Sequence, residues 1–310
     1  MALNRADPLL YLPPVGGAEL VVYHYVVVGT LAVVCFDLLD SSFEDYAIFT
    51  QKRWTPITCL YAISRFSTLA FVLQDLLSQY VLATNCQFWT TFSSIFFVLA
   101  HASTSAMFLV RASVVYNRFR WLIVFFAFAW VVAVCGCTLI FIATTTMHLG
   151  PTHLCLGGIK GPYLMATIFI QCAYDTIICG AITYKLGVEN RDEYVSGRWK
   201  PWRLPVTMNF HRLEQRFMQD SQIFYLLTMC FKIPEIIIYF ALATSHVVPT
   251  GPVILIMAFA DTAVTSIMAG RMYRRMKLGR PGLLEGAITI ETFALDRLTV
   301  TVIQTRSRAI

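Results

Sequence analysis

Two opposite charges flank a proline in an otherwise apolar stretch, FKIPEIIIYF at residues 231–240. Lys232 and Glu235 are three residues apart, so on a helix they share one face. Pro234 between them has no backbone N–H donor and is expected to kink the helix. The stretch therefore predicts an internal ion pair beside a helix kink.

Further polar groups fall in apolar stretches elsewhere in the chain. They are His101, Asp175 and Asp261. A charge at the centre of a bilayer costs about 2.5–3.5 kcal/mol on insertion scales, so such residues face the interior of a helix bundle. Together with Lys232 and Glu235 they give three acids and one lysine at a similar depth. This surplus of negative charge requires a bound proton, compensation by the charge of Arg65, or a bound ligand or ion.

Two interpretations of this group stay open. Buried charges can pair with one another and fix the register of the helices without any ligand. They can also line a pocket for a ligand or ion, or serve as proton donors in an enzyme. A separate pair, Asp37 and Arg65, is expected near the inner face of the membrane, and we predict a structural role for it.

The rest of the chain supplies the helices that hold these residues. Of its 310 residues, 57% are apolar or aromatic and only 14% are charged. A helix needs roughly 20 mostly apolar residues to span a bilayer. Seven stretches meet this requirement, at about 20–39, 57–78, 87–111, 121–145, 162–184, 222–244 and 250–270. The sequence predicts an all-α membrane protein, a bundle of seven transmembrane helices over residues 20–270.

The basic residues predict the orientation of the bundle. Most of the 24 lysines and arginines lie in the connections after the first, third and fifth spans and in the tail, which marks that side as cytoplasmic. Residues 1–19 are then extracellular, and 271–310 form a basic cytoplasmic tail. Attraction to anionic membrane lipid accounts for the net charge of +6, so no nucleic-acid partner is expected. The plasma membrane or an endomembrane is the predicted location.

Two of the nine cysteines differ from the rest in their surroundings. Seven fall within predicted spans, whereas Cys86 begins the third span and Cys155 lies in the connection between the fourth and fifth spans. Both are on the outer side, where an oxidising compartment lets a disulfide persist. We expect a bridge between Cys86 and Cys155, with two free thiols as the alternative.

Several kinds of chemistry lack the residues that they need. No predicted span contains two of the six histidines, which argues against a metal site built from two histidines on one helix. A retinal Schiff base needs a lysine, and its expected place is the seventh span. The only intramembrane lysine, Lys232, lies in the sixth span. We therefore predict no metal, no cofactor and no catalytic residue.

Five short motifs lie along the chain: FDLLD (36–40), KRW (52–54), LYAISRF (60–66), LVRASVVYNRFR (109–120) and GRMYRRMKL (270–278). Together they resemble a family of seven-helix integral membrane proteins of unknown function from basidiomycete fungi. The order and orientation of the spans are also similar to those of G-protein-coupled receptors, as is a bridge from the third span to the second outer connection. Two receptor signatures are absent, the acidic residue before Arg111 and an Asn-Pro pair in the seventh span.

This layout predicts a receptor-like function. A small ligand bound within the bundle would shift the sixth span about Pro234 and alter the inner connection. Residues 185–221 and 271–310 are the expected contacts of a cytoplasmic signalling partner. The alternative is an intramembrane enzyme or ion-coupled carrier that uses the same carboxylates.

Overall fold

Long helices make up most of the protein. The computed structural model describes residues 14–50, 55–80, 85–116, 119–148, 155–159, 163–195, 227–238, 240 and 251–279. The long helices are α1 (Pro14–Asp40), α3 (Pro56–Tyr80), α4 (Cys86–Val115), α5 (Arg120–Thr138), α7 (Tyr163–Val195) and α9 (Gly251–Gly279). The shorter elements are α2 (Ser42–Phe49), α6 (Ile140–Ala143), β1 (Thr144–His148) and β2 (Cys155–Ile159). Residues 227–238 form a further helix, which we call the 227–238 helix.

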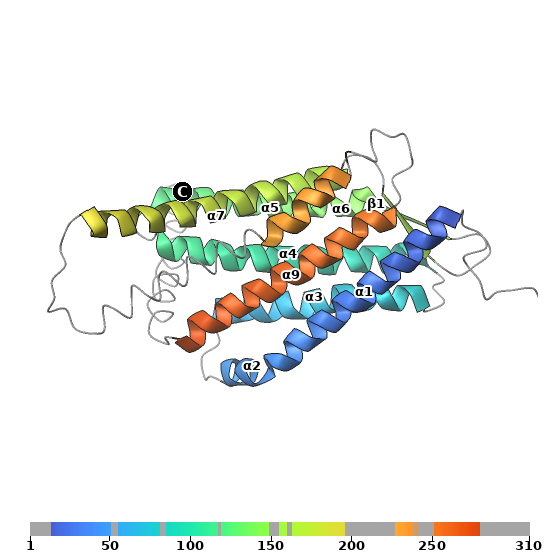
Figure 1. Ribbon diagram of the computed structural model, residues 1–310, viewed down its shortest axis with the longest axis horizontal. Coiled ribbons are helices and arrows are strands. Elements are labelled where there is room, and N and C mark those ends of the chain that lie inside the picture. The colour runs from blue at the N-terminus through green and yellow to red at the C-terminus, as the bar shows by residue number, and fades with distance from the viewer. Residues whose placement is uncertain are drawn as a thin grey trace, which may run out of the picture.

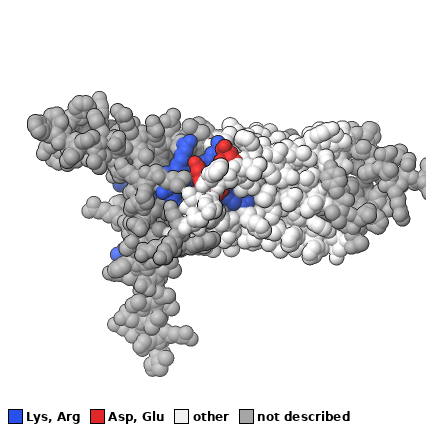
Figure 2. Space-filling model, turned by 90° about the horizontal axis from the view of Figure 1, so that it is seen from below, with Lys and Arg blue, Asp and Glu red and all other residues white. Residues whose placement is uncertain are grey.

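Six helical stretches of the described residues are long and apolar enough to cross a membrane. They are Ala18–Asp40, Pro56–Ser78, Cys86–Val115, Arg120–Ala143, Tyr163–Lys185 and Leu255–Arg275. Large apolar side chains such as Phe128 point outward, and in Figure 2 charged groups gather in one region beside an uncharged surface. Because such a surface suits lipid and not water, this confirms the predicted helical, multi-pass membrane protein.

The predicted seventh crossing and the orientation stay predictions. Of the expected span at 222–244, the structure describes 227–238 and 240, and the remaining positions lie outside the described residues. The same holds for residues 1–13 of the predicted outer segment, for 196–221 of the predicted inner connection and for 280–310 of the predicted tail.

The helices pack side by side along the long axis of the molecule (Figure 1). α3 lies against α4, α9 packs against α1, α3 and α4, and α5 and α7 lie beside α4 and each other. One buried apolar cluster includes Tyr61 and Tyr273, and a second includes Val72 and Phe259. The β-hairpin and the first turns of α1 lie at one end of the bundle, and α2 and the last turns of α9 lie at the other (Figure 1). We call these the hairpin end and the α2 end.

A β-hairpin corrects the prediction of an all-α chain. β1 pairs with β2 in antiparallel register, with Thr144 opposite Ile159 and His148 opposite Cys155. The predicted fourth span at 121–145 is wrong at its end, because the helix stops at Ala143 and the chain becomes extended from Thr144. A run of three threonines begins there, and β-branched side chains favour strands over helices.

Helix α2 was not predicted. It follows α1 after a single residue, Ser41, whose Oγ donates a 2.7 Å hydrogen bond to the Asp37 carbonyl. Glu44 and Asp45 in its first turn complement the positive end of the helix dipole, and this signal is visible in the sequence.

Several helix limits also differ from the predicted ones, and α9 continues to Gly279, past the expected end at 270. α1 begins at Pro14, before the expected start at 20, and α7 continues to Val195, past the expected end at 184. Apolarity marks where a span can lie in lipid, whereas a helix continues into water wherever no residue breaks it. The first part of the predicted 185–221 connection is therefore helical.

Helices α5 and α7 approach closely at Gly136. A Cβ atom built on Gly136 would lie 2.9 Å from Cγ2 of Ile170 on α7. The Gly136 carbonyl oxygen also accepts a 3.0 Å hydrogen bond from Thr167 Oγ1. Small residues allow this kind of close contact between helices in membranes.

We expect Gly136→Ala to lower the melting temperature of the solubilised protein, with a loss of about 1–3 kcal/mol, because the new methyl group overlaps Ile170. Gly180→Ala on α7 is the matched control, since nothing lies within 4 Å of its Cβ position. That control should be neutral or stabilising by roughly 0.5–1 kcal/mol. Equal melting temperatures for the two variants would show that α5 and α7 do not touch at Gly136.

Candidate functional site

Lys232 connects three helices through two ion pairs. Its Nζ lies 3.1 Å from Oδ2 of Asp175 on α7 and 3.3 Å from Oδ2 of Asp261 on α9. None of the three side chains is more than 8% exposed. We call these residues the Lys232 triad. Buried charges are tolerated only when they are paired, so the two aspartates explain how this lysine is held inside the bundle.

Polar neighbours lie one helical turn from each aspartate. Nε2 of Gln171 donates to Oδ1 of Asp175 at 3.5 Å. Oγ1 of Thr265 lies 3.5 Å from Oδ1 of Asp261 and donates a shorter bond, 2.6 Å, to the Asp261 carbonyl. Residues four apart on a helix are neighbours, so Gln171 helps to orient the Asp175 carboxylate on its own helix, whereas the Thr265 hydroxyl is held mainly by the Asp261 carbonyl.

Glu235 lies beside the Lys232 triad but does not join it. It is 4% exposed and within electrostatic range of Lys232 and Asp261. Among the described residues, none forms a hydrogen bond or an ion pair with its carboxylate. Lys232 thus pairs with two other helices and not with Glu235 on its own helix. Three-residue spacing puts both side chains on one face, but it does not make their charged groups meet.

His101 is the fifth residue of the predicted group. It is buried on α4, and its Nε2 lies 3.2 Å from Oγ1 of Thr262 on α9. Its ring centroid is 4.4 Å from that of Phe97, and Lys232 and Asp261 are within electrostatic range. All five predicted residues are therefore buried in one part of the bundle, and Pro234 lies inside the 227–238 helix.

Buried hydroxyl groups occupy the interface of α3, α4 and α9. Oγ of Ser64 lies 3.0 Å from Oγ1 of Thr104 and 3.2 Å from Oγ of Ser266. Thr262 and Thr265, which contact His101 and Asp261, precede Ser266 on α9. We call this row of hydroxyls the polar seam. It extends from the Lys232 triad toward the α2 end.

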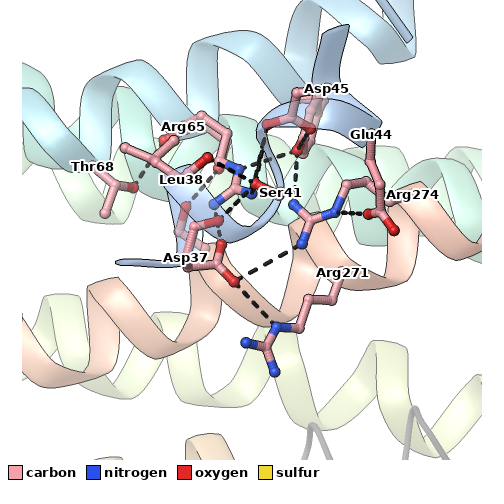
Figure 3. Close-up of polar contacts among 12 residues, drawn as sticks. Asp37, Leu38, Ser41, Glu44, Asp45, Arg65, Thr68, Arg271 and Arg274 are labelled. Carbon is pink, nitrogen blue, oxygen red and sulfur yellow. Dashed lines mark hydrogen bonds and ion pairs between the residues drawn. The ribbon is translucent and has the colours of Figure 1, made fainter. Parts of the chain in front are cut away.

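The predicted pair of Asp37 and Arg65 is part of a larger network at the α2 end (Figure 3). Asp37 on α1 accepts a hydrogen bond from Arg65 on α3 and another, of 3.1 Å, from Nε of Arg271 on α9. Nη2 of Arg274 lies 3.9 Å from the same carboxylate. One buried carboxylate is thus shared by three arginines from two helices.

Tyr61 connects the same network to α2 (Figure 3 shows the surrounding side chains). Its hydroxyl donates a 2.5 Å bond to Oδ1 of Asp45 and accepts bonds from Nε of Arg65 at 3.1 Å and Nη1 of Arg274 at 2.9 Å. Nε of Arg274 also lies 2.9 Å from Oε2 of Glu44. We call this set the inner network. Sequence reasoning missed Tyr61, although its position four residues before Arg65 was a usable signal.

A second buried lysine lies beyond the apolar part of α9. Nζ of Lys277 donates a 3.0 Å bond to Oγ1 of Thr58 and lies 5.8 Å from the ring centroid of Tyr273. Burial lowers the pKa of Lys277 below its ordinary value. Unlike Lys232, it has no carboxylate partner among the described residues.

The predicted outer bridge is partly described. Cys86, the first residue of α4, is buried and disulfide-bonded, and seven other cysteines are free. Cys155 begins β2, and β1 of the same hairpin packs against α4. The side chain of Cys155 lies outside the described residues, so its pairing with Cys86 stays a prediction.

Non-reducing digestion should yield one peptide that joins the segments around Cys86 and Cys155. Alkylation of denatured, unreduced protein should label only the seven free cysteines. Cys86→Ser should then expose Cys155 to alkylation and cost about 2–4 kcal/mol of stability, because the hairpin loses its cross-link. Alkylation of both cysteines in unreduced wild type would show that no disulfide joins Cys86 and Cys155.

Comparisons with known proteins find similar solved structures but no matching family. No protein-family model matches the chain, and no curated protein matches it. Among solved structures, the chain is similar to the crystal structure of squid rhodopsin, with 15% sequence identity and a TM-score of 0.48 over 94% of this chain and 88% of that chain. The resemblance to the basidiomycete family stays a prediction. The described helices identify the chain as a multi-pass helical membrane protein.

Proposed function

We propose that this chain is a receptor-like, seven-helix membrane protein that binds a small ligand beside the Lys232 triad. The observation that carries the proposal is the pair of contacts made by Lys232, which ties the 227–238 helix to both α7 and α9. A ligand with a charged group at this place competes for one of these partners. Binding therefore changes how the 227–238 helix packs.

Pro234 supports a movement of this helix. It lies two residues after Lys232, and a proline inside a helix removes one backbone hydrogen bond and favours a bend. Neighbouring groups must satisfy the carbonyl that this leaves without its donor. The segment that carries the lysine is thus the part of the bundle that most easily takes two arrangements.

Helix α9 supplies a route from the ligand to the inner network. It carries Asp261 of the Lys232 triad and also Arg271 and Arg274, which contact Asp37. A shift of α9 at Asp261 therefore displaces the arginines at the α2 end. Such coupling requires an element with two discrete arrangements, and we infer that the shared contacts of Asp37 provide it. A cytoplasmic signalling partner would then meet the segments at 185–221 and 271–310.

Native mass spectrometry of the full chain in mild detergent tests the proposal. We expect a small molecule that copurifies, dissociates chemically unchanged and is bound roughly tenfold more weakly by Asp261→Asn, because one charged partner is lost. Glu44→Gln is the control, since Glu44 belongs to the inner network and is 53% exposed. It should keep the wild-type occupancy.

Several results would contradict the receptor-like function. A bound molecule that is converted during incubation would indicate an intramembrane enzyme. No bound molecule in wild type, or one whose occupancy is the same in Asp261→Asn, would exclude a ligand at the Lys232 triad.

Removal of the ligand should also change hydrogen–deuterium exchange at 185–195 and 271–279, where α7 and α9 end. Unchanged exchange there would exclude transmission to the inner face.

A further inference from the structure

Glu235 is the acid that the central group leaves without a partner. Both aspartates contact Lys232, whereas the Glu235 carboxylate has no hydrogen bond or ion pair with any described residue. The Glu235 residue is nevertheless buried, with an exposed fraction of 4%. More than nine in ten buried polar groups in native proteins have a partner, so this carboxylate either binds a proton or pairs with a group from outside the described residues.

The local charge indicates the sign of that partner. Among the described residues, Lys232 is the one cation near the three carboxylates, and Asp261 and Lys232 are the charged groups within range of Glu235. His101 belongs to the same part of the bundle and contacts the hydroxyl of Thr262. A buried carboxylate without a counter-charge is strongly disfavoured. The missing partner is therefore positive or supplies hydrogen-bond donors.

The geometry favours an ammonium group over a metal ion. In the described part of the chain, no group of three or more His, Cys, Asp or Glu is arranged to hold a metal ion. An ammonium group carries its own donors, and a single carboxylate with one or two further acceptors can hold it. Pro234 also lacks the N–H that would bond to the Cys230 carbonyl in a regular helix, which leaves a further acceptor on the same helix.

Aromatic rings lie beside His101 toward the hairpin end, and Ile236, which follows Glu235, packs against the same apolar cluster. Phe97, one turn before His101, lies 5.6 Å from Phe71, and Phe71 stacks on Phe259 at 4.6 Å between ring centroids. Phe259 precedes Asp261 by two residues on α9. A ligand that reaches Glu235 from this side passes apolar, aromatic surface, which suits a hydrocarbon or aryl body.

We propose that the ligand of this site is an amine whose protonated nitrogen pairs with Glu235 and whose apolar body faces the phenylalanines. The proposal rests on the proposed function, because it requires a ligand in the bundle. The ammonium group supplies the positive charge that Glu235 lacks, and it competes with Lys232 for Asp261, which is within electrostatic range of Glu235.

Two probes of matched shape test the amine. They are 2-phenylethylamine and 2-phenylethanol, which differ in an ammonium against a hydroxyl group. At neutral pH we expect the amine to raise the melting temperature of the full-length protein in lipid nanodiscs at concentrations where the alcohol has no effect. In Glu235→Gln the apparent affinity for the amine should fall roughly tenfold or more. Glu235→Asp, which keeps the charge, should retain the preference for the amine, and Glu44→Gln should behave as wild type.

Any other outcome contradicts the proposal that an amine binds at Glu235. Equal stabilisation by the two probes, or none by either, excludes an ammonium site at Glu235. Stabilisation by NaCl relative to choline chloride that disappears in Glu235→Gln would place a metal cation there instead. A copurified ligand that depends on Asp261 but contains no basic nitrogen would overturn the amine and leave the receptor-like function intact. If no ligand that depends on Asp261 copurifies, both the amine ligand and the receptor-like function are contradicted.

Discussion

Lys232→Met is expected to lower the stability of the protein by about 3–5 kcal/mol, because it leaves Asp175 and Asp261 buried without their counter-charge. Methionine has a similar length and suits an apolar interior, so lost packing contributes little. The measurement is the melting temperature of the detergent-solubilised full chain. This is the largest single effect that we expect in the centre of the bundle.

Lys277→Met is the matched control for this substitution. Lys277 is buried as well, but its described partners are the Thr58 hydroxyl and the Tyr273 ring. Its removal should cost at most about 1.5 kcal/mol, because no charge is left unpaired. Lys232→Met combined with Asp175→Asn and Asp261→Asn should regain most of the lost stability, since a neutral group of the same shape replaces the whole set of charges. If Lys232→Met is as stable as Lys277→Met, Lys232 does not face the bundle interior.

Asp37→Asn is expected to have a similarly large effect at the α2 end. It leaves Arg65, Arg271 and Arg274 close together without the carboxylate that they share. Removal of one partner from a buried charge network costs about 3–5 kcal/mol. Loss of this contact should also loosen the junction of α1 and α2. Limited proteolysis near residues 40–50 should therefore accelerate in parallel with the fall in melting temperature.

Glu44→Gln tests whether burial causes the large loss of stability that we expect for Asp37→Asn. Glu44 contacts Arg274 in the same network, but its side chain is 53% exposed, against 2% for Asp37. Exposed ion pairs contribute about 0–1 kcal/mol, so this variant should stay near wild type. Equal losses for the two variants would mean that the network is solvated throughout and does not hold α1, α3 and α9 together.

The transmembrane helices could be predicted because their signal is local. A run of apolar residues of sufficient length has one favourable environment, and the predicted span at 87–111 lies within α4 (Cys86–Val115). The group around Lys232 could be predicted for the same reason, since an ionisable residue within such a run must face inward. In both cases a stretch of one helix contains all the information needed.

Choices between distant partners could not be predicted in this way. The sequence left Glu235, Asp175 and Asp261 as candidate partners of Lys232. The lysine meets the two aspartates, because the packing of three helices decides which carboxylates reach Nζ. Tyr61 and Arg274 are far apart in the chain, and only the approach of α3 to α9 brings them together. The hairpin was missed because the predicted span was extended to residue 145, past Ala143 and into the threonines that begin β1.

The most direct test of the central claim is a double-mutant cycle between Lys232 and Asp261, measured as stability of the full-length protein. The claim is that one buried lysine ties the 227–238 helix to α7 and α9. It predicts that Lys232→Met and Asp261→Asn each destabilise the protein, and that the double variant is more stable than the sum of the two losses implies. The coupling energy should exceed about 1.5 kcal/mol, as expected for charged groups in contact. Additive effects, with a coupling energy near zero, would contradict the claim.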